Sequence, residues 1–144
     1  MSDKKQELHE LEQRIHVAAL VNPRSGAGSG ARAMDSLSKQ PNTQVFDLLD
    51  FARNADEASA RLTQHLRQCD QDGQEVRLIV GGGDGTVTWA FSILDRICAD
   101  CDDVKMPAVA HLALGTSNEV AGCAGWARAD NGKRLGSFVR KVRQ

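Results

Sequence analysis

The sequence has no apolar run that approaches the roughly 20 residues needed to cross a bilayer, and its first twelve residues are mostly polar. It therefore predicts no transmembrane helix and no signal peptide. It also has almost no excess of charge, because 18 Lys and Arg are balanced by 19 Asp and Glu, for a formal net charge of −1. So little net charge provides no strong field to attract nucleic acid. We expect a cytoplasmic protein without a nucleic-acid partner.

The sequence is also poor in cysteine, with four in 144 residues. Cys98 and Cys101 form a CxxC pair, but Cys69 and Cys123 are isolated, so the four do not have the spacing of a zinc site. The pair falls where a helix is expected to end, whereas a redox-active pair gains thiolate stability from the start of a helix. The cysteines are therefore predicted to be reduced thiols.

Histidine gives no stronger indication of a metal. His9, His16 and His65 show no ligand spacing with one another. His111 lies in an apolar segment, where we expect it to be a buried residue of the sheet. The cysteines and histidines thus predict no metal site.

The sequence does contain a regular alternation of hydrophobic periods. Short, nearly continuous apolar runs, typical of strands buried on both faces, alternate with segments of helical spacing. The expected strands are His16–Asn22, Thr43–Leu49, Val76–Val80 and Pro107–Leu114. The expected helices are Ala31–Lys39, a helix from a capping box of Asn54 and Glu57 to about Cys69, Val87–Cys98, a short helix ending near Ala124, and a terminal amphipathic helix with Leu135, Phe138, Val139 and Val142. This order predicts an α/β fold, a Rossmann-like open parallel sheet with helices on both faces.

The chain is expected to hold one domain, residues 16–144, after an N-terminal extension, residues 1–15. Leu8, Leu11 and Ile15 have helical spacing in a charged background, but they span fewer than two heptads. The extension is therefore predicted to be a loosely docked helix or tail and not a coiled coil.

Three polar, glycine-containing loops each follow an expected strand: Asn22–Gly26, Gly81–Thr86 and Gly115–Asn118. The carboxyl ends of parallel strands meet at one edge of the sheet, where ligands bind. Glycines let backbone N–H groups approach phosphate oxygens, and the N-terminus of a following helix favours negative charge. The pattern predicts a phosphate-bearing ligand, and tight turns without a ligand are the alternative interpretation.

The two commonest phosphate-binding patterns do not fit these loops. Gly81–Thr86 is not followed by the Lys of a P-loop, and the spacing of Gly26, Gly28 and Gly30 is not that of the dinucleotide fingerprint.

The three motifs together resemble the catalytic domain of diacylglycerol kinases. Val-Asn-Pro-Arg-Ser-Gly at 21–26, Gly-Gly-Gly-Asp-Gly-Thr at 81–86 and the segment 107–121 occur in the order and spacing of that family. The family is grouped with sphingosine, ceramide and bacterial lipid kinases and, more distantly, with NAD kinases. The resemblance covers about residues 17–126.

The resemblance implies an ATP-dependent kinase that uses Mg²⁺ and transfers a phosphoryl group to the hydroxyl of diacylglycerol or a related lipid, a reaction of lipid signalling. Such transfer depends mostly on positioning and on neutralising phosphate charge. Asp84 is the expected catalytic residue, placed to orient a metal ion or a hydroxyl. The nucleotide-binding residues that the resemblance implies are Asn22, Ser25, Gly82, Gly83, Gly85, Thr86, Gly115, Thr116 and Asn118.

The sequence departs from the family pattern in the third motif. The family usually has Gly-Thr-Gly-Asn-Asp, then an apolar pair and Arg, whereas Ser117, Glu119 and Gly122 replace the second Gly, the Asp and the Arg here. Family members also have a second, mostly β domain, which this chain is expected to lack. We therefore expect nucleotide binding without efficient turnover. A sphingoid-base or NAD-kinase-like domain and a non-catalytic nucleotide-binding or interaction module remain alternatives.

The last helix is expected to have a basic polar face, made by Lys133, Arg134, Arg140, Lys141 and Arg143. A solvated face is the simpler interpretation, and transient contact with an anionic membrane surface is the alternative. Apolar surface left exposed would favour self-association.

Overall fold

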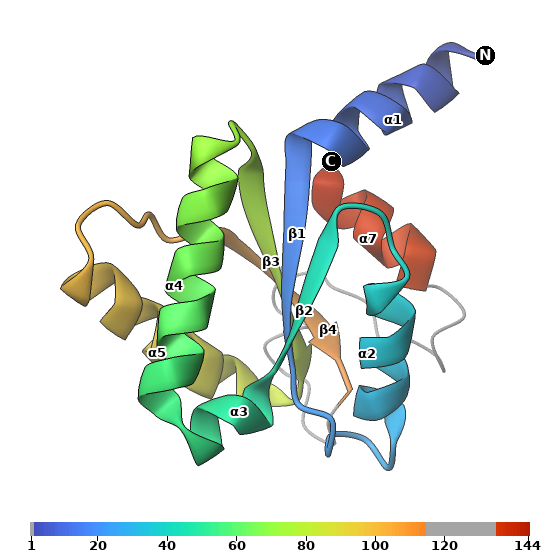
Figure 1. The fold of residues 1–144 in the computed structure, drawn as a ribbon. Helices are drawn as coiled ribbons and strands as arrows, with labels where there is room; N and C mark the ends of the chain where they lie inside the picture. The colour runs from blue at the N-terminus through green and yellow to red at the C-terminus, as the bar shows by residue number, and fades with distance from the viewer. Residues whose placement is uncertain (1, 115–134) are drawn as a thin grey trace.

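The computed structural model describes residues 2–114 and 135–144, and the described strands form one parallel sheet in the order β2-β1-β3-β4 (Figure 1). The strands are β1 Ile15–Val21, β2 Thr43–Asp47, β3 Glu75–Gly82 and β4 Ala108–Ala113. The helices are α1 Asp3–Arg14, α2 Ser29–Ser38, α3 Leu48–Arg53, α4 Ala55–Gln71, α5 Asp84–Asp100 and α7 Leu135–Arg143. The predicted α/β fold with an open parallel sheet is confirmed.

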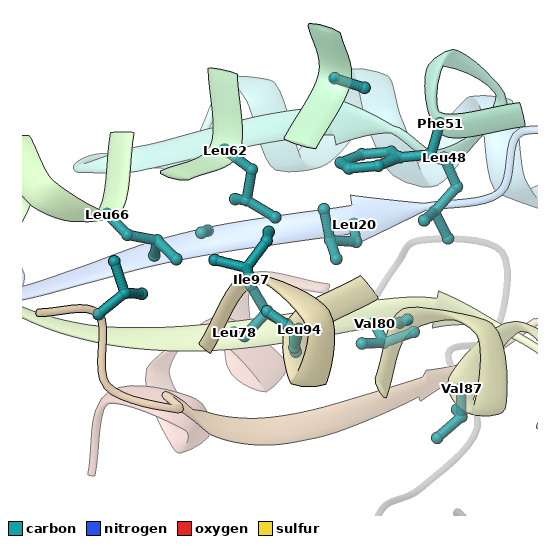
Figure 2. Packing of buried hydrophobic residues seen from close by; sticks show 14 residues of the cluster. Leu20, Leu48, Phe51, Leu62, Leu66, Leu78, Val80, Val87, Leu94 and Ile97 are labelled. Atoms are coloured by element: carbon teal, nitrogen blue, oxygen red, sulfur yellow. The ribbon is translucent and has the colours of Figure 1, made fainter. Parts of the chain in front are cut away.

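Helices cover both faces of the sheet, so the core has two layers. On one face, α3, α4 and α5 pack on Ala18 and Leu20 of β1 and on Leu78 and Val80 of β3 (Figure 2). On the other face, α2 and α7 pack on the alternate residues of the same strands. Because successive side chains of a strand point to opposite faces, all seven residues of β1 are buried.

The helical connections that follow the two central strands, β1 and β3, lead to opposite edges of the sheet. The chain passes from β1 through α2 to β2 on one side, and from β3 through α5 to β4 on the other. The point of divergence between two such neighbouring strands opens a crevice at their carboxyl ends, and ligands bind there in open α/β sheets.

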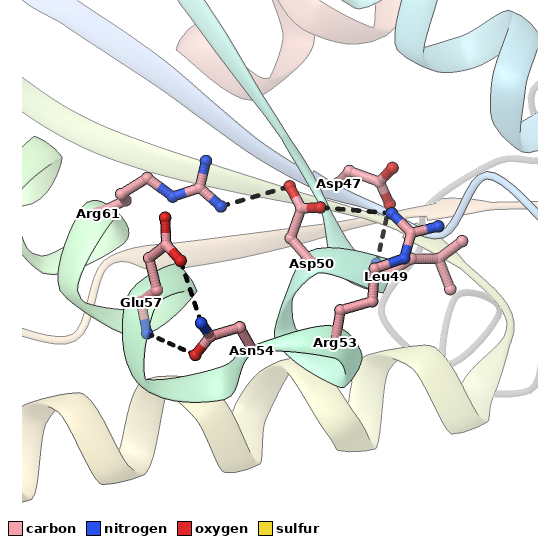
Figure 3. A network of polar contacts seen from close by, with 7 residues as sticks. All are labelled: Asp47, Leu49, Asp50, Arg53, Asn54, Glu57 and Arg61. Atoms are coloured by element: carbon pink, nitrogen blue, oxygen red, sulfur yellow. Dashed lines mark hydrogen bonds and ion pairs between the residues drawn. The ribbon is translucent and has the colours of Figure 1, made fainter.

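The prediction of a strand over Thr43–Leu49 was wrong in its second part, because β2 ends at Asp47 and α3 begins at Leu48. The Asp47 side chain caps the helix by accepting a hydrogen bond of 2.8 Å from the Leu49 backbone N–H (Figure 3). The turn buries Leu48 and Phe51 against the α4 face of the sheet. Leu48 and Leu49 continue the apolar pattern of the strand but are helical, because the Asp47 cap favours a helical turn there.

The capping box at the start of α4 is confirmed. Asn54 Oδ1 accepts a 3.3 Å hydrogen bond from the Glu57 backbone N–H, and Asn54 Nδ2 donates to Glu57 Oε2 at 3.0 Å (Figure 3). Asp50 of α3 also pairs with Arg61 of α4 at 3.5 Å. The first two contacts cap α4, and the third joins α4 to α3.

Helix α5 begins at Asp84, three residues before the expected start at Val87. The difference matters for function because Asp84, Gly85 and Thr86 lie in the first turn of a helix and not in a loop. The Val87 N–H donates to the Gly83 carbonyl at 3.1 Å, which closes this first turn.

The two ends of the described chain differ in how firmly they are held. The expected N-terminal extension is the helix α1, which has no buried residue. In α7, the prediction that Arg143 belongs to an exposed basic face was wrong, since its side chain is 1% exposed. Arg143 instead donates to the carbonyls of Ile15, Pro41 and Asn42. None of the described helices is both long and apolar enough to cross a membrane.

Candidate functional site

The loops that follow β1 and β3 lie beside Leu114, the residue after β4, at the carboxyl edge of the sheet. The Asn22 N–H donates to the Gly81 carbonyl at 2.9 Å, and the Leu114 N–H donates to the Gly82 carbonyl at 3.1 Å. Because Asn22 begins the first loop and Leu114 precedes the third, the start of the Gly81–Thr86 loop lies between them. The predicted residues of the third loop, Gly115, Thr116 and Asn118, lie outside the described residues.

Close approach of backbone to backbone explains the glycines of the first loop. Gly26 has φ +60°, and a Cβ added there would lie 2.1 Å from the Leu114 carbonyl oxygen. A Cβ at Gly30, in the first turn of α2, would lie 2.1 Å from the Asn22 carbonyl oxygen. Any side chain at either position would push the first loop away from its neighbours.

The loop after β3 is held from two directions. A Cβ at Gly82, where φ is +157°, would lie 2.5 Å from the Thr86 side chain, so α5 turns back closely over the end of the strand. His111 is buried in β4, as predicted, and its Nε2 donates to the Gly82 carbonyl at 2.7 Å. The sequence did not indicate this role, because only the pairing of β3 with β4 brings the two residues together.

The first turn of α5 presents backbone donors at this edge. Gly83 is the N-cap residue and supplies no side-chain cap. The first N–H groups of a helix have no partner within it and carry its partial positive charge, which together favour an anion. A Cβ at Gly85 would meet no atom within 4 Å, so the space outside this turn is open.

The side chains of the predicted site have unequal access to that space. The Asn22 Oδ1 accepts from the Arg24 N–H at 3.0 Å, so this side chain shapes its own loop. Ser25 and Asp84 are half-buried, whereas Thr86 is 7% exposed and faces Gly82. The backbone of the α5 turn, together with Ser25 and Asp84, therefore forms the accessible part of the described site.

Comparison with known protein families matches most of the chain to one family. Residues 16–144 match the family described as the diacylglycerol kinase catalytic domain. The chain belongs to this family.

Individual relatives of this kinase domain come from animals and plants. The chain is 31% identical over 129 residues to the eye-specific diacylglycerol kinase of Drosophila melanogaster, 30% identical over 125 residues to diacylglycerol kinase 1 of the same species, and 29% identical over 120 residues to diacylglycerol kinase 7 of Arabidopsis thaliana. The alignments cover 89%, 86% and 76% of this chain, but 8%, 9% and 24% of the relatives. No solved structure is significantly similar to the chain.

A cavity of about 370 Å³ lies at the opposite end of the sheet of this kinase domain, between the end of α4 and the start of β3 and β4. Its lining is of mixed charge, with Arg67, Asp70, Asp103 and Lys105, and includes none of the described site residues. Arg67 donates two hydrogen bonds to the Asp103 carboxylate, at 2.7 and 3.0 Å, which lower the pKa of that carboxyl group. The glycines of the predicted phosphate site and the N-terminus of α5 lie at the other end of the sheet, away from this cavity.

The sequence did not reveal a group of side chains that lies far from the candidate nucleotide site. His16 and His65 show no ligand spacing in the sequence, but in the structure their Nε2 atoms lie 2.8 Å apart, and Cys69 is close to both. His65 and Cys69 lie 49 and 53 positions after His16 in the sequence, so no local spacing could reveal the group.

Proposed function

We propose that this chain binds ATP at the carboxyl edge of its sheet and that it is the nucleotide-binding part of a lipid kinase. The observation that supports this most directly is the passage of Gly81–Gly83 into the N-terminus of α5, which has no side-chain cap, between Asn22 after β1 and Leu114 after β4. Polyphosphate is the ligand that such a turn favours. The family of the chain then selects ATP among the nucleotides.

The proposed binding residues differ in the chemical group that each provides, backbone or side chain. Gly82 and Gly83 supply backbone at the end of β3 and the N-cap of α5, Gly85 and Thr86 supply backbone of the first turn of α5, and Ser25 supplies a hydroxyl from the neighbouring loop. Asn22 holds the first loop in shape. Gly115, Thr116 and Asn118 complete the proposed set from the third motif of the sequence.

Asp84 is proposed as the catalytic residue and as the protein ligand of Mg²⁺. Its half-buried carboxylate in the first turn of α5 fits that ion, because Mg²⁺ prefers oxygen ligands and is usually held by one or two carboxylates and by phosphate oxygens. When bound, Mg²⁺ neutralises phosphate charge. The chain's own part is to hold the phosphates against the α5 turn and so to orient the terminal phosphoryl group.

The proposed reaction is transfer of the terminal phosphoryl group of ATP to the hydroxyl of diacylglycerol, which gives phosphatidic acid and ADP. It rests on family membership, and a sphingoid base is the alternative acceptor within lipid kinases. The proposed domain, residues 16–144, supplies the nucleotide side of this reaction, with transient contact at a membrane surface to reach the lipid.

A second candidate is a nucleotide-binding module that does not catalyse transfer. The observation that favours it is the altered third motif, in which Ser117, Glu119 and Gly122 replace the residues usual in the family. The usual Gly, Asp and Arg of this motif lie outside the α5 turn. Their replacement would therefore reduce turnover before it reduces phosphate binding at that turn.

Calorimetric titration with ATP and ADP, with and without Mg²⁺, tests the proposal, with NAD as the control ligand. We expect saturable ATP binding that Mg²⁺ strengthens and no comparable binding of NAD. Absence of ATP binding, or equal binding of NAD, would overturn it. Incubation with labelled ATP and vesicles of diacylglycerol, or of sphingosine, then separates the kinase from the non-catalytic module, because only the kinase labels a lipid.

A further inference from the structure

His16, His65 and Cys69 form a cluster of metal-ligating side chains that the proposed kinase chemistry does not use. His16 is the second residue of β1, whose opposite end leads into the candidate nucleotide site. His65 and Cys69 are four residues apart in α4, so they lie on one face of that helix, and this face packs on the sheet. The cluster therefore joins α4 to the start of the central strand.

The three potential ligand atoms converge on one point. The Nε2 atoms of His16 and His65 lie 2.8 Å apart, and the Cys69 Sγ lies 3.8 Å from His65 Nε2. All three atoms are within 4.8 Å of one another. In a tetrahedral zinc site with two His and one Cys, the ligand atoms lie about 3.3–3.6 Å apart. Changes of at most about 1.2 Å in these three separations would convert the observed arrangement into that geometry.

A second layer of hydrogen bonds fixes the orientation of His16. Asn42 Nδ2 donates to the carbonyls of Glu12 and Ile15, at 2.7 and 3.2 Å, so its Oδ1 is turned to His16. His16 Nδ1 lies 2.7 Å from that oxygen and must donate to it. In a neutral ring, His16 Nε2 is then the bare nitrogen and faces the cluster. Metal-binding histidines are commonly oriented in this way, by a hydrogen bond from the nitrogen that does not bind the metal.

Burial and charge around the cluster also suit a cation. His16 and Cys69 are buried, and His65 is half-buried, so the cluster is largely shielded from solvent and is reached through the His65 side. Burial lowers the pKa of His65, and His16 lowers it further, so the ring is neutral and able to coordinate at neutral pH. Burial and the charge of Asp72 raise the pKa of the Cys69 thiol. A divalent cation beside Sγ would stabilise the thiolate and would be attracted by Asp72.

We propose that His16 Nε2, His65 Nε2 and Cys69 Sγ bind one Zn²⁺ ion, with a water molecule as the fourth ligand. Imidazole and thiolate favour zinc over Mg²⁺ and Ca²⁺, which prefer oxygen, so this site is distinct from the proposed Mg²⁺ ligand Asp84. On binding, the Cys69 thiol proton leaves to solvent, and the His65 proton moves from Nε2 to Nδ1. One proton is released for each ion bound. The ion would link α4 to β1 and stabilise the folded state.

Zinc titration of the metal-free full chain, in competition with a chromogenic chelator, tests the proposal. We expect one equivalent to bind with a dissociation constant below about 1 µM, with release of one proton and a rise in melting temperature. His65→Gln and Cys69→Ser should each weaken binding at least about 100-fold. The matched controls are His9→Gln, on the exposed helix α1, and Cys98→Ser, in the CxxC pair, and both should bind like the unmodified chain.

Cobalt provides a second readout, whose first observation is made on the unmodified chain. Co²⁺ bound to the unmodified chain should show a thiolate-to-cobalt charge-transfer band, which Cys98→Ser keeps and a folded Cys69→Ser loses. Absence of this band in the unmodified chain, or zinc binding weaker than about 10 µM, would overturn the proposal. Tight binding that survives Cys69→Ser and is lost in Cys98→Ser would also overturn it and would assign the ion to the CxxC pair.

Discussion

The carbonyl oxygen of Leu114 occupies the space that a side chain at Gly26 would need, since a Cβ there would lie 2.1 Å from it. The first loop of the candidate site thus packs directly on the residue that precedes the third. This contact couples two motifs that lie almost ninety positions apart in the sequence.

Gly26→Ala should therefore lower the free energy of unfolding by at least about 2 kcal/mol, from the left-handed φ together with the clash. Gly73→Ala is the matched control, because Gly73 has φ +74° but a Cβ there would meet no atom within 4 Å. It should cost only about 1 kcal/mol, the backbone part alone. Urea unfolding measures both values, and equal losses would show that the contact with Leu114 contributes nothing.

The charge of an added side chain at the start of α5 should decide ATP binding. Gly83 is an N-cap with φ −90°, a conformation open to any residue, and Asp and Asn are both good N-caps. Gly83→Asp and Gly83→Asn should therefore fold equally well. Calorimetry should show ATP binding at least about tenfold weaker in Gly83→Asp, because a carboxylate at the N-cap repels phosphate. The same ATP affinity in both variants would contradict phosphate binding at this turn.

Arg143 should matter for stability although it is one residue from the end of the chain. Its guanidinium is buried and donates to the carbonyls at the start of β1 and before β2, including Ile15 at 3.3 Å. Arg143→Ala leaves these carbonyls without their donor and should lower the free energy of unfolding by about 3 kcal/mol. Arg140→Ala, on the exposed side of the same helix, should change it by less than about 0.5 kcal/mol. Thermal or urea unfolding compares the two, and similar losses would remove the special role of Arg143.

Stability should fall on acidification through the histidine pair. The pKa of His65 in the folded state is below its ordinary value of 6.5, because of burial and then of His16. At pH values near and below 6.5, the unfolded chain therefore binds more protons than the folded one, so the free energy of unfolding decreases as the pH falls. One such group contributes at most about 1.4 kcal/mol per pH unit. Urea unfolding in the presence of a chelator should show this slope reduced in His65→Gln and unchanged in His9→Gln.

Local patterns explain which parts of the fold were predictable. The strands β1 and β3 and the capping box of Asn54 and Glu57 depend on residues that are neighbours in the chain, and all are found near their expected positions. The helix α3 was missed because Leu48 and Leu49 continue an apolar strand pattern, whereas the Asp47 cap and burial of Phe51 favour a helical turn. The earlier start of α5 has a similar cause, since Asp84, Gly85 and Thr86 are typical loop residues until the helix that follows organises them.

The sequence by itself determined the alternation of strands and helices, the three glycine-containing motifs and the family, because each is carried by residues close together in the chain. Only the tertiary structure decided which residues from distant parts of the chain come into contact. Parallel pairing of β3 with β4 brings His111 to the Gly82 carbonyl, and packing of α4 on β1 brings His65 to His16. Burial of α7 likewise turns Arg143 from an expected surface charge into a donor for Ile15. Contacts between distant segments depend on how the helices pack on the sheet, and hydrophobic periodicity fixes which face of an element is buried but not which partner that face finds.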